Sequence, residues 1–452
     1  MTDAINDICA HVVGTQYDDL SPTAIEAAKT FILDTLGVGI GGGTGPGAAD
    51  LVTAMAAMGS GEGATVWATG QTMPAAHAAM CNAYQIHCQE FDCVHEEAVA
   101  HVMTVVLPCA LAHAERVGGI DGKALMTAVV LGVDVASALG SAATSGLRFF
   151  RPATAGAMGA AAALGKLMGF DAETLRHACS LAYGQVCGTM QAHTEGSGLM
   201  AMQIGFNARN AVTACDLAAA GFTGPENILE GPFGYFTLIE DGSDLGPHLA
   251  RLGKDWRITE VAHKPFPSGR ATHGILDGCL ALQRAHGFTA GEVSAIRLSV
   301  PPLIRHLVGR PPTTRMAINY ARLSAAYVTA CALHEPLTRE DFTDAAYLRE
   351  DRQALANRVS MQVREGDDPN ALVPIHVEIE LADGTVLLES VEQVYGCPEN
   401  PMSRDAQLEK FRMCWSHAHA PLTSRAGEAM IDMIDRLEAL SDFRDLVALT
   451  RP

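Results

Sequence analysis

The stretch HCQEFDCVHEEAVAH, residues 87–101, places three histidines, two cysteines and four acidic residues within fifteen positions. Histidine and carboxylate side chains held beside apolar helices can have pKa values tuned for general acid–base catalysis, and we favour this interpretation. Two alternatives stay open, a metal site that uses His87, His95 and His101, and a merely solvated polar segment.

The spacing weakens the metal alternative. The two histidines of HEEAVAH lie six residues apart, so they do not share one helical face as the ligands of H-E-x-x-H do. No metal or cofactor is therefore predicted. The stretch contains no Gly or Pro, so it is not predicted to form a turn.

Two other stretches are basic, although the chain carries a net charge of −20. Each lacks acidic residues and contains four basic or histidine side chains: His263, Lys264, Arg270 and His273 in HKPFPSGRATH, and Arg305, His306, Arg310 and Arg315 in LIRHLVGRPPTTR. Such clusters on an acidic protein indicate a site for a small anion, because Arg pairs bidentately with carboxylate or phosphate. Ion pairs with acids elsewhere in the chain are the alternative. The glycine-rich GIGGGTGPG, 39–47, follows a predicted helix and lacks G-K-[ST], so it is interpreted as a helix-ending loop.

These residues must be positioned by a mainly helical chain. SPTAIEAAKTFILDTLGVGIGGG opens with Ser21 as a helix cap and Pro22 at the first helical position. Helical spacing of small and apolar residues predicts further helices at 107–117, 123–141, 154–169, 172–187 and 199–220.

The pattern changes after residue 262. One helix is predicted near 271–286, and VSAIRLSV and RVSMQVRE alternate as strands do. IHVEIELADGTVLLESV predicts two strands joined at Asp383-Gly384. We therefore expect a helical domain over 1–262, a smaller α+β domain over 263–397, and C-terminal helices over 398–452 that pack back on the first domain.

Composition limits the class of protein. Apolar residues make up 48% of 452 residues, which predicts a globular chain of two to three domains. The acidic charge disfavours nucleic-acid and membrane partners. The twelve cysteines include no C-x-x-C pair, and MTDAINDICAHVVG does not resemble a signal peptide, so a reducing, cytoplasmic location is expected. TAVVLGVDVASALGSAA is interrupted by Asp134 and is interpreted as a buried helix.

Five motifs, in order, resemble those of the MmgE/PrpD family, which includes 2-methylcitrate dehydratases, cis-aconitate decarboxylases and iminodisuccinate epimerases. The first and second are FILDTLGVGIGG and NAYQIHCQEFDCVHEEAVAHVMTVVLPCALAHAE. The others are FRPATAGAMGAAAALGKLMG, KPFPSGRATHGILD and NYARLSAAYVTACAL. The resemblance implies a helical domain built from both chain ends, a smaller α+β domain, a homodimer, and acid–base chemistry at the domain interface without a required metal.

The resemblance also assigns residues. His101, Lys264 and Tyr327 fall on family motif residues, and Glu90 joins them in the predicted catalytic group. The predicted substrate-binding residues are Asp92, Arg151, Met200, Arg270, Thr272 and His273.

The chain departs from the family motifs at several of these positions. Cys93 and Val94 replace an acid and a threonine, Arg151 replaces a histidine, and Met200 replaces a lysine. We expect Arg151 to return one positive charge to the pocket, and Met200 to favour substrates with fewer carboxylates.

The sequence thus predicts a lyase that acts on a small carboxylate by proton transfer next to a carboxylate. In this prediction His101 is the acid–base group, and Lys264 holds a carboxylate or shares the proton. An epimerase, racemase or isomerase of a small dicarboxylate is an alternative, and so is a non-catalytic binder of small acids.

Overall fold

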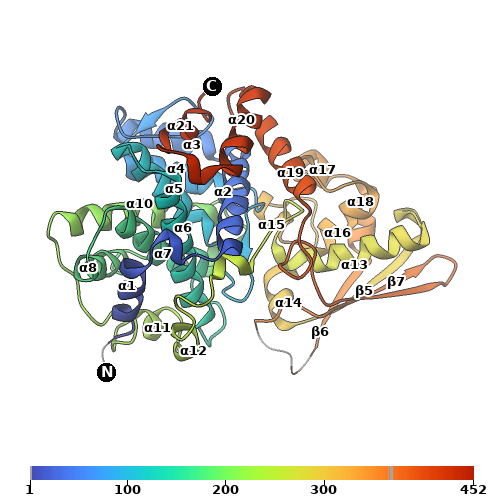
Figure 1. Cartoon of the computed structure of the whole chain (residues 1–452). Helices are drawn as coiled ribbons and strands as arrows, with labels where there is room; N and C mark the ends of the chain where they lie inside the picture. Colours follow the sequence, from blue (N-terminus) through green and yellow to red (C-terminus); the bar gives the residue numbers. More distant parts are fainter. Residues whose placement is uncertain (1–2, 365, 367–369) are drawn as a thin grey trace.

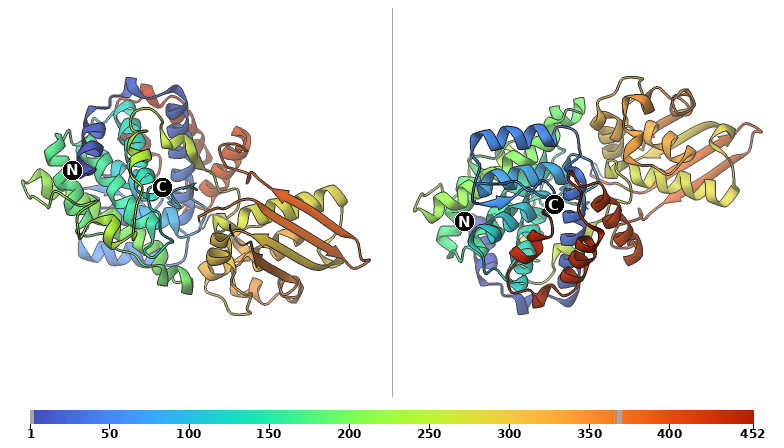
Figure 2. Two further views of the ribbon diagram at one scale, coloured as in Figure 1. Left: turned by 90° about the horizontal axis from the view of Figure 1, so that it is seen from below. Right: turned by 90° about the horizontal axis from the view of Figure 1, so that it is seen from above.

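The computed structural model describes residues 3–364, 366 and 370–452, which form a large helical domain and a smaller α+β domain (Figure 1). Figure 2 shows the smaller domain as a distinct body at one side of the helical domain. The predicted fold class, mainly α with a smaller α+β domain, is confirmed.

Long helices of small and apolar residues form the centre of the helical domain. They are α2 (Pro22–Gly42), α4 (Ala75–His87), α5 (Met103–Val117), α6 (Gly122–Ser141), α7 (Arg151–Leu167) and α10 (Leu199–Ala219). Where α6 and α7 cross, a Cβ on Gly159 would stand 2.3 Å from the carbonyl oxygen of Gly132. Only glycine permits this approach of two backbones, which explains why the sequence is rich in Gly at such contacts.

Shorter elements cover this centre. The helices are α1 (Ile5–Gly14), α3 (Ala48–Met58), α8 (Ala172–Tyr183), α9 (Met190–Glu195), α11 (Tyr235–Leu238) and α12 (Gly246–Leu249). A two-stranded ribbon joins β1 (Ala64–Thr65) to β2 (Thr72–Met73). As the sequence predicts, Ser21 caps α2 by accepting a hydrogen bond from the backbone N–H of Ala24.

The smaller domain packs helices on one face of a four-stranded sheet of order β6-β5-β7-β8. Its strands are β5 (Val293–Val300), β6 (Val359–Val363), β7 (Ile375–Leu381) and β8 (Val386–Val391). Only the β5–β6 pair is parallel among the described strands of this sheet. The hairpin turn between β7 and β8 contains Gly384 at φ 89°, as Asp383-Gly384 predicts.

Helix α13 (Arg270–His286) covers the buried face of that sheet. Ile375 and Val377 of β7 pack against Gly274 and Gly278 of α13, and the intervening strand residue His376 is exposed. The remaining helices are α14 (Pro302–Val308), α15 (Ile318–Arg322), α16 (Ala325–His334), α17 (Asp344–Tyr347) and α18 (Glu350–Ala356). Because the sheet anchors α13, it also fixes the N-terminus of α13, where Arg270 lies.

The C-terminal helices return to the helical domain (Figure 1). They are α19 (Arg404–Ser416), α20 (Ser424–Asp435) and α21 (Arg444–Ala448). Helix α19 lies along α2, where the Phe411 ring occupies the space beside Gly37, and α21 lies against α5. The first domain is therefore built from both chain ends.

A short ribbon ties the stretch 87–101 to the crossover between the domains. Strand β3 (Val94–His95) pairs antiparallel with β4 (Val261–Ala262), so that Val94 lies opposite Ala262. Lys264 follows β4 by two residues. This pairing brings two segments together that are more than 160 residues apart in the chain.

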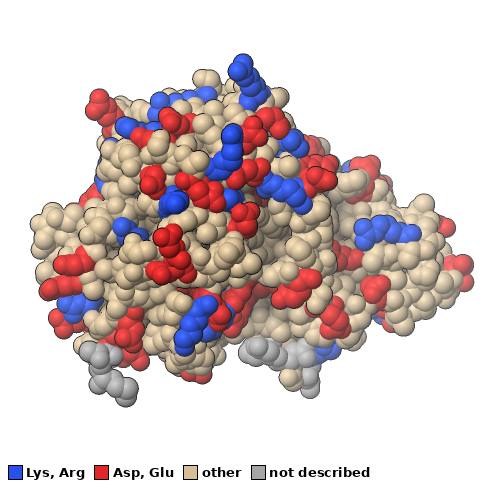
Figure 3. Space-filling view, in the orientation of Figure 1, with Lys and Arg blue, Asp and Glu red and all other residues tan. Residues whose placement is uncertain are grey.

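One described helix, α6, is long and apolar enough to cross a membrane, but most of it is buried inside the protein. Acidic and basic side chains are interspersed on the face shown in Figure 3, without a continuous basic area.

Candidate active site

A cavity lies between the two domains and is lined by residues of both. Its charged and histidine side chains are Glu90, Glu96, His101 and His193 from the helical domain and Arg270 from the α+β domain. Apolar side chains that include Val99, Phe150 and Leu323 complete the lining. Polar groups that converge in an apolar cleft at a domain interface are typical of an active site.

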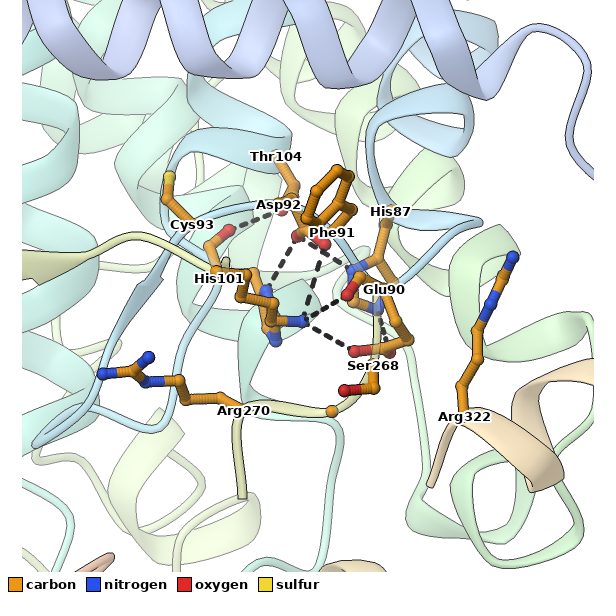
Figure 4. A network of polar contacts seen from close by, with 12 residues as sticks. His87, Glu90, Phe91, Asp92, Cys93, His101, Thr104, Ser268, Arg270 and Arg322 are labelled. Atoms are coloured by element: carbon orange, nitrogen blue, oxygen red, sulfur yellow. Dashed lines mark hydrogen bonds and ion pairs between the residues drawn. The ribbon is translucent and has the colours of Figure 1, made fainter. Parts of the chain in front are cut away.

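Asp92 stands between two histidines beneath this cavity (Figure 4). Its Oδ2 lies 2.7 Å from Nδ1 of His101 and 3.0 Å from Nδ1 of His87. The His87 contact is a hydrogen bond, whereas the His101 contact is close but lacks hydrogen-bond geometry. Because an ionised carboxylate only accepts, both contacts favour a proton on Nδ1 of each ring. Nε2 of His101 therefore keeps a free lone pair while the ring is neutral, and the side chain of His101 is the partly exposed member of the group.

Lys264 is completely buried and pairs with Glu90. Its Nζ lies 2.8 Å from Oε2 of Glu90, donates to the Glu90 backbone carbonyl at 3.2 Å, and stands 3.9 Å from Oδ1 of Asp92. Figure 4 shows the contacts among His87, Glu90, Asp92 and His101 as one connected network. The structure thus brings together four of the predicted site residues: Glu90, Asp92, His101 and Lys264.

The backbone that carries these groups turns twice, contrary to the expectation from its lack of Gly and Pro. Helix α4 ends at His87, and Glu90 follows at φ 54°. Val99, at φ 48°, closes a second turn in which His95 and Ala100 form an antiparallel bridge. Non-glycine residues at positive φ store conformational strain, and for a branched residue such as Val this is unusual. Strain of this kind is concentrated at functional sites.

The pKa values of the two histidines move in opposite directions. Burial disfavours the charged form of His101, and with Lys264 nearby it lowers the pKa of His101 although Asp92 acts to raise it. For His87, Asp92 and Glu90 outweigh burial and raise the pKa. His101 is therefore the neutral ring that faces the cavity, and His87 is the ring that holds a second proton more readily.

Both carboxylates stay ionised in this surrounding. Burial acts to raise the pKa of Glu90 and of Asp92, but neighbouring cations outweigh it and lower both values. For Glu90 the main opposing charge is Lys264, and for Asp92 it is His101 in its protonated form.

The structure does not bring together the three histidines that were considered as metal ligands, His87, His95 and His101. His95 does not join His87 and His101, because its Nε2 contacts Glu260 at 3.1 Å and its Nδ1 accepts from the Ala98 N–H. The described residues do bring potential ligand atoms of His87, Asp92 and His101 within 4.8 Å of one another. In this cluster the Lys264 ammonium lies 3.9 Å from Oδ1 of Asp92, so a positive charge already stands beside the potential carboxylate ligand.

Arg151 does not bring a positive charge to the cavity, so that expectation is wrong. Its Nη2 and Nε lie 2.9 and 3.1 Å from the carboxylate of Glu240, and both side chains are buried. Nη1 donates to the Ala98 carbonyl at 3.3 Å. Arg151 thus holds the turn that precedes His101.

Arg270 lines the cavity, but its donors bind protein groups. Nε lies 2.5 Å from Oε1 of Glu96, and Nη1 donates to the Tyr395 carbonyl at 2.7 Å. The two residues predicted beside it are buried in α13: the Thr272 hydroxyl donates to the Gly269 carbonyl at 2.8 Å, and His273 Nε2 lies 3.2 Å from the Ser268 carbonyl.

Two predicted site residues, Tyr327 and Met200, belong neither to the cavity lining nor to the network around His101. The Tyr327 hydroxyl donates to the Asp341 carbonyl at 2.6 Å, and its ring packs against Phe342 and Tyr347. Met200, at the start of α10, is 1% exposed and belongs to the main hydrophobic core. The structure therefore gives neither side chain a contact with the His101 group.

Among the charged and histidine side chains of the lining, sequence analysis missed two, Glu96 and His193. Glu96 belongs to the stretch 87–101 and was not singled out there. His193 lies in α9, in a segment without a motif, and no sequence signal would have found it.

Comparison with known families matches the MmgE/PrpD N-terminal domain over residues 6–248 and the MmgE/PrpD C-terminal domain over residues 266–436. Cis-aconitate decarboxylase of Mus musculus is 29% identical, with 97% of this chain and 91% of the relative covered. Cis-aconitate decarboxylases of Aspergillus terreus and Homo sapiens are each 27% identical, with 98% and 97% of this chain and 95% and 92% of the relatives covered. The chain belongs to the MmgE/PrpD family.

Proposed function

We propose that this chain is a lyase that acts on a small carboxylate by proton transfer at a carbon next to a carboxylate. The observation that carries the proposal is the contact of His101 Nδ1 with Asp92 at the wall of the interdomain cavity. The relatives support it, because those compared are decarboxylases of a small polycarboxylate.

His101 is the acid–base group in this proposal. Asp92 fixes the proton on Nδ1, so that Nε2 presents its lone pair as a base or, once protonated, delivers a proton. The lowered pKa of His101 favours the neutral base near neutral pH. In an elimination, His101 would take the proton from carbon while the C–O bond breaks, and the departing hydroxide would leave as water by taking a proton from the protonated ring. In a decarboxylation, the C–C bond breaks, CO₂ leaves, and the electron pair left on carbon takes a proton from the protonated ring.

Lys264 and Glu90 form a buried ion pair beside the carboxylate of Asp92. The ammonium stands within 4 Å of both carboxylates of the network and offsets their charge, so negative charge that develops on the substrate is not opposed by two unpaired carboxylates. Glu90 lines the cavity and keeps Lys264 in place.

The test is a panel of mono-, di- and tricarboxylates that includes cis-aconitate and 2-methylcitrate. Three readouts separate the reactions: CO₂ release, formation of an alkene with loss of water, and incorporation of deuterium from D₂O without net change. Release of CO₂ or water supports a lyase. Deuterium incorporation with inversion supports an epimerase instead. Binding without turnover across the panel contradicts catalysis and favours a binder of small acids.

A further inference from the structure

Three cations near the His101 group are each neutralised by a buried or half-buried carboxylate. Lys264 pairs with Glu90, Arg270 with Glu96 and Arg151 with Glu240. These pairs leave little net positive charge for an anionic substrate, so a carboxylate far from the reacting carbon needs another partner.

Arg310 is a cation without such a neutralising partner. No carboxylate lies within 4.0 Å of its guanidinium in the described part of the chain. Its Nη1 is buried without a hydrogen-bond partner among the described residues. Its guanidinium also stacks over the Tyr320 ring at 5.4 Å. Neither Arg310 nor Arg322 lines the cavity itself. Arg322 likewise contacts no acid in that part, but it donates to the Cys88 carbonyl, whereas Arg310 contacts a residue of the cavity lining.

Arg310 crosses the domain interface to His193. Its Nη2 donates to His193 Nδ1 at 2.9 Å and to the His193 carbonyl. A guanidinium has donors only, so Nδ1 of His193 must accept and the ring proton must lie on Nε2. His193 lines the same cavity as Glu90 and His101. Burial and the charge of Arg310 lower the pKa of His193 to about 3, so the ring stays neutral.

We propose that His193 is a second carboxylate-binding residue of this cavity, which donates a hydrogen bond from Nε2 to the remote carboxylate of a dicarboxylate substrate. Arg310 is its positioning residue, which fixes the proton on Nε2 and places a positive charge behind the ring. This inference rests on the proposed function, since it names the second anionic end of the substrate.

The test measures binding of an inert pair of ligands, succinate and butyrate, by calorimetry, so it does not depend on turnover. Wild type should bind succinate more tightly than butyrate. In His193→Leu, Kd for succinate should rise by about 10-fold or more, the effect of one hydrogen bond to a charged group, while Kd for butyrate stays within about twofold. Arg310→Met should weaken succinate binding similarly, and Arg310→Lys should restore part of it. The controls are His376→Leu and Arg297→Met, which alter exposed side chains on the sheet of the α+β domain, the domain that contains Arg310.

Two results would overturn the proposal. One is an equal rise in Kd for succinate and butyrate, or a rise in neither. Either result would make the Arg310–His193 contact a purely structural contact between the domains. The other is a ¹⁵N spectrum in which the His193 signal, identified by its loss in His193→Leu, reports a proton on Nδ1. In Arg310→Met that signal should shift toward mixed tautomers. Failure of the whole carboxylate panel in turnover with intact succinate selectivity would count against the lyase proposal alone.

Discussion

Asp92 contacts two histidines whose pKa values are shifted in opposite directions. His87 is wholly buried and has two carboxylates nearby, so its pKa is raised, whereas His101 faces the cavity and has a lowered pKa. One carboxylate thus keeps a neutral ring at the cavity and a second ring that protonates readily behind it.

Lys264→Met separates a catalytic role from a structural one. Because it removes the lysine partner of the buried Glu90 and leaves only His87 Nε2, 3.5 Å away, as a counter-ion, we expect the variant to lose about 3–5 kcal/mol of stability. In Lys264→Met/Glu90→Gln the unpaired charge is absent, so the free energy of unfolding should recover, but kcat should stay low. Denaturant unfolding and steady-state kinetics check this, with the exposed Lys254→Met as control. Recovery of kcat together with stability would make Lys264 structural only.

At the scale of residues, the sequence identifies the members of the site better than the groups with which each side chain pairs. The spacing and the family motifs named Glu90, Asp92, His101 and Lys264, which the structure brings together. The counter-ions of Arg151 and Arg270 lie 89 and 174 residues away in the chain, so no local pattern could show that these charges are neutralised.

At the scale of elements, the turn after β3 positions His101. It is held by the His95–Ala100 bridge and by the hydrogen bond from Arg151 to Ala98. This turn could not be predicted from the sequence, because Val99 adopts a positive φ, which sequence patterns assign to Gly or Asn.

Substitution of Val99 measures the strain in that turn. Val99→Ala removes the branched side chain and retains a Cβ at φ 48°, whereas Val99→Gly removes the Cβ as well. We expect Val99→Gly to be more stable than Val99→Ala by about 1 kcal/mol, the reverse of the usual order for ordered positions. Thermal unfolding of both variants decides it, and greater stability of the Ala variant would show that the turn is unstrained.

The Arg151–Glu240 pair provides a second test at this scale. Arg151→Met leaves Glu240 buried without its cation and should cost about 3–5 kcal/mol. Arg151→Met/Glu240→Gln should regain most of this free energy of unfolding, yet kcat should remain reduced because Ala98 has lost its donor. Circular dichroism and kinetics of both variants check the prediction. Wild-type kcat in the double variant would remove Arg151 from the positioning of His101.

At the scale of the molecule, local sequence predicted the fold class, and the family resemblance implied a site at the domain interface, but the contacts that build this interface were not predictable. Helical spacing and strand alternation predict each domain from local sequence, as α6 and β7 illustrate. The cavity depends instead on contacts between segments remote in sequence, such as β3 with β4 and Arg310 with His193.

Buried neutral histidines should make the folded protein sensitive to acid. His101, His193, His263 and His273 all have pKa values below the ordinary 6.5, chiefly because burial disfavours their charged form. Below pH 6.5 the unfolded chain binds protons that the folded chain does not, so stability falls as pH falls, by at most about 1.4 kcal/mol per pH unit for each ring.

His87, with its raised pKa, opposes this trend in part. Calorimetry from pH 8 to pH 5 should show a nearly constant Tm above pH 7 and a steep decrease below about pH 6.5. The carboxylates of the site do not interfere, because their lowered pKa values act at more acidic pH. A Tm that stays constant or rises toward pH 5 would contradict the assignment of neutral buried rings.

The central claim, that His101 is the acid–base group of the interdomain cavity, is tested most directly by the pH profile of kcat/KM in wild type and His101→Gln. For a base with a lowered pKa, wild-type activity should be constant at neutral pH and decrease as the pH falls through a value below 6.5. His101→Gln should keep the fold, lower kcat by about 10²-fold or more, and lose that acidic limb. Turnover near the wild-type rate with an unchanged profile in His101→Gln would contradict the account.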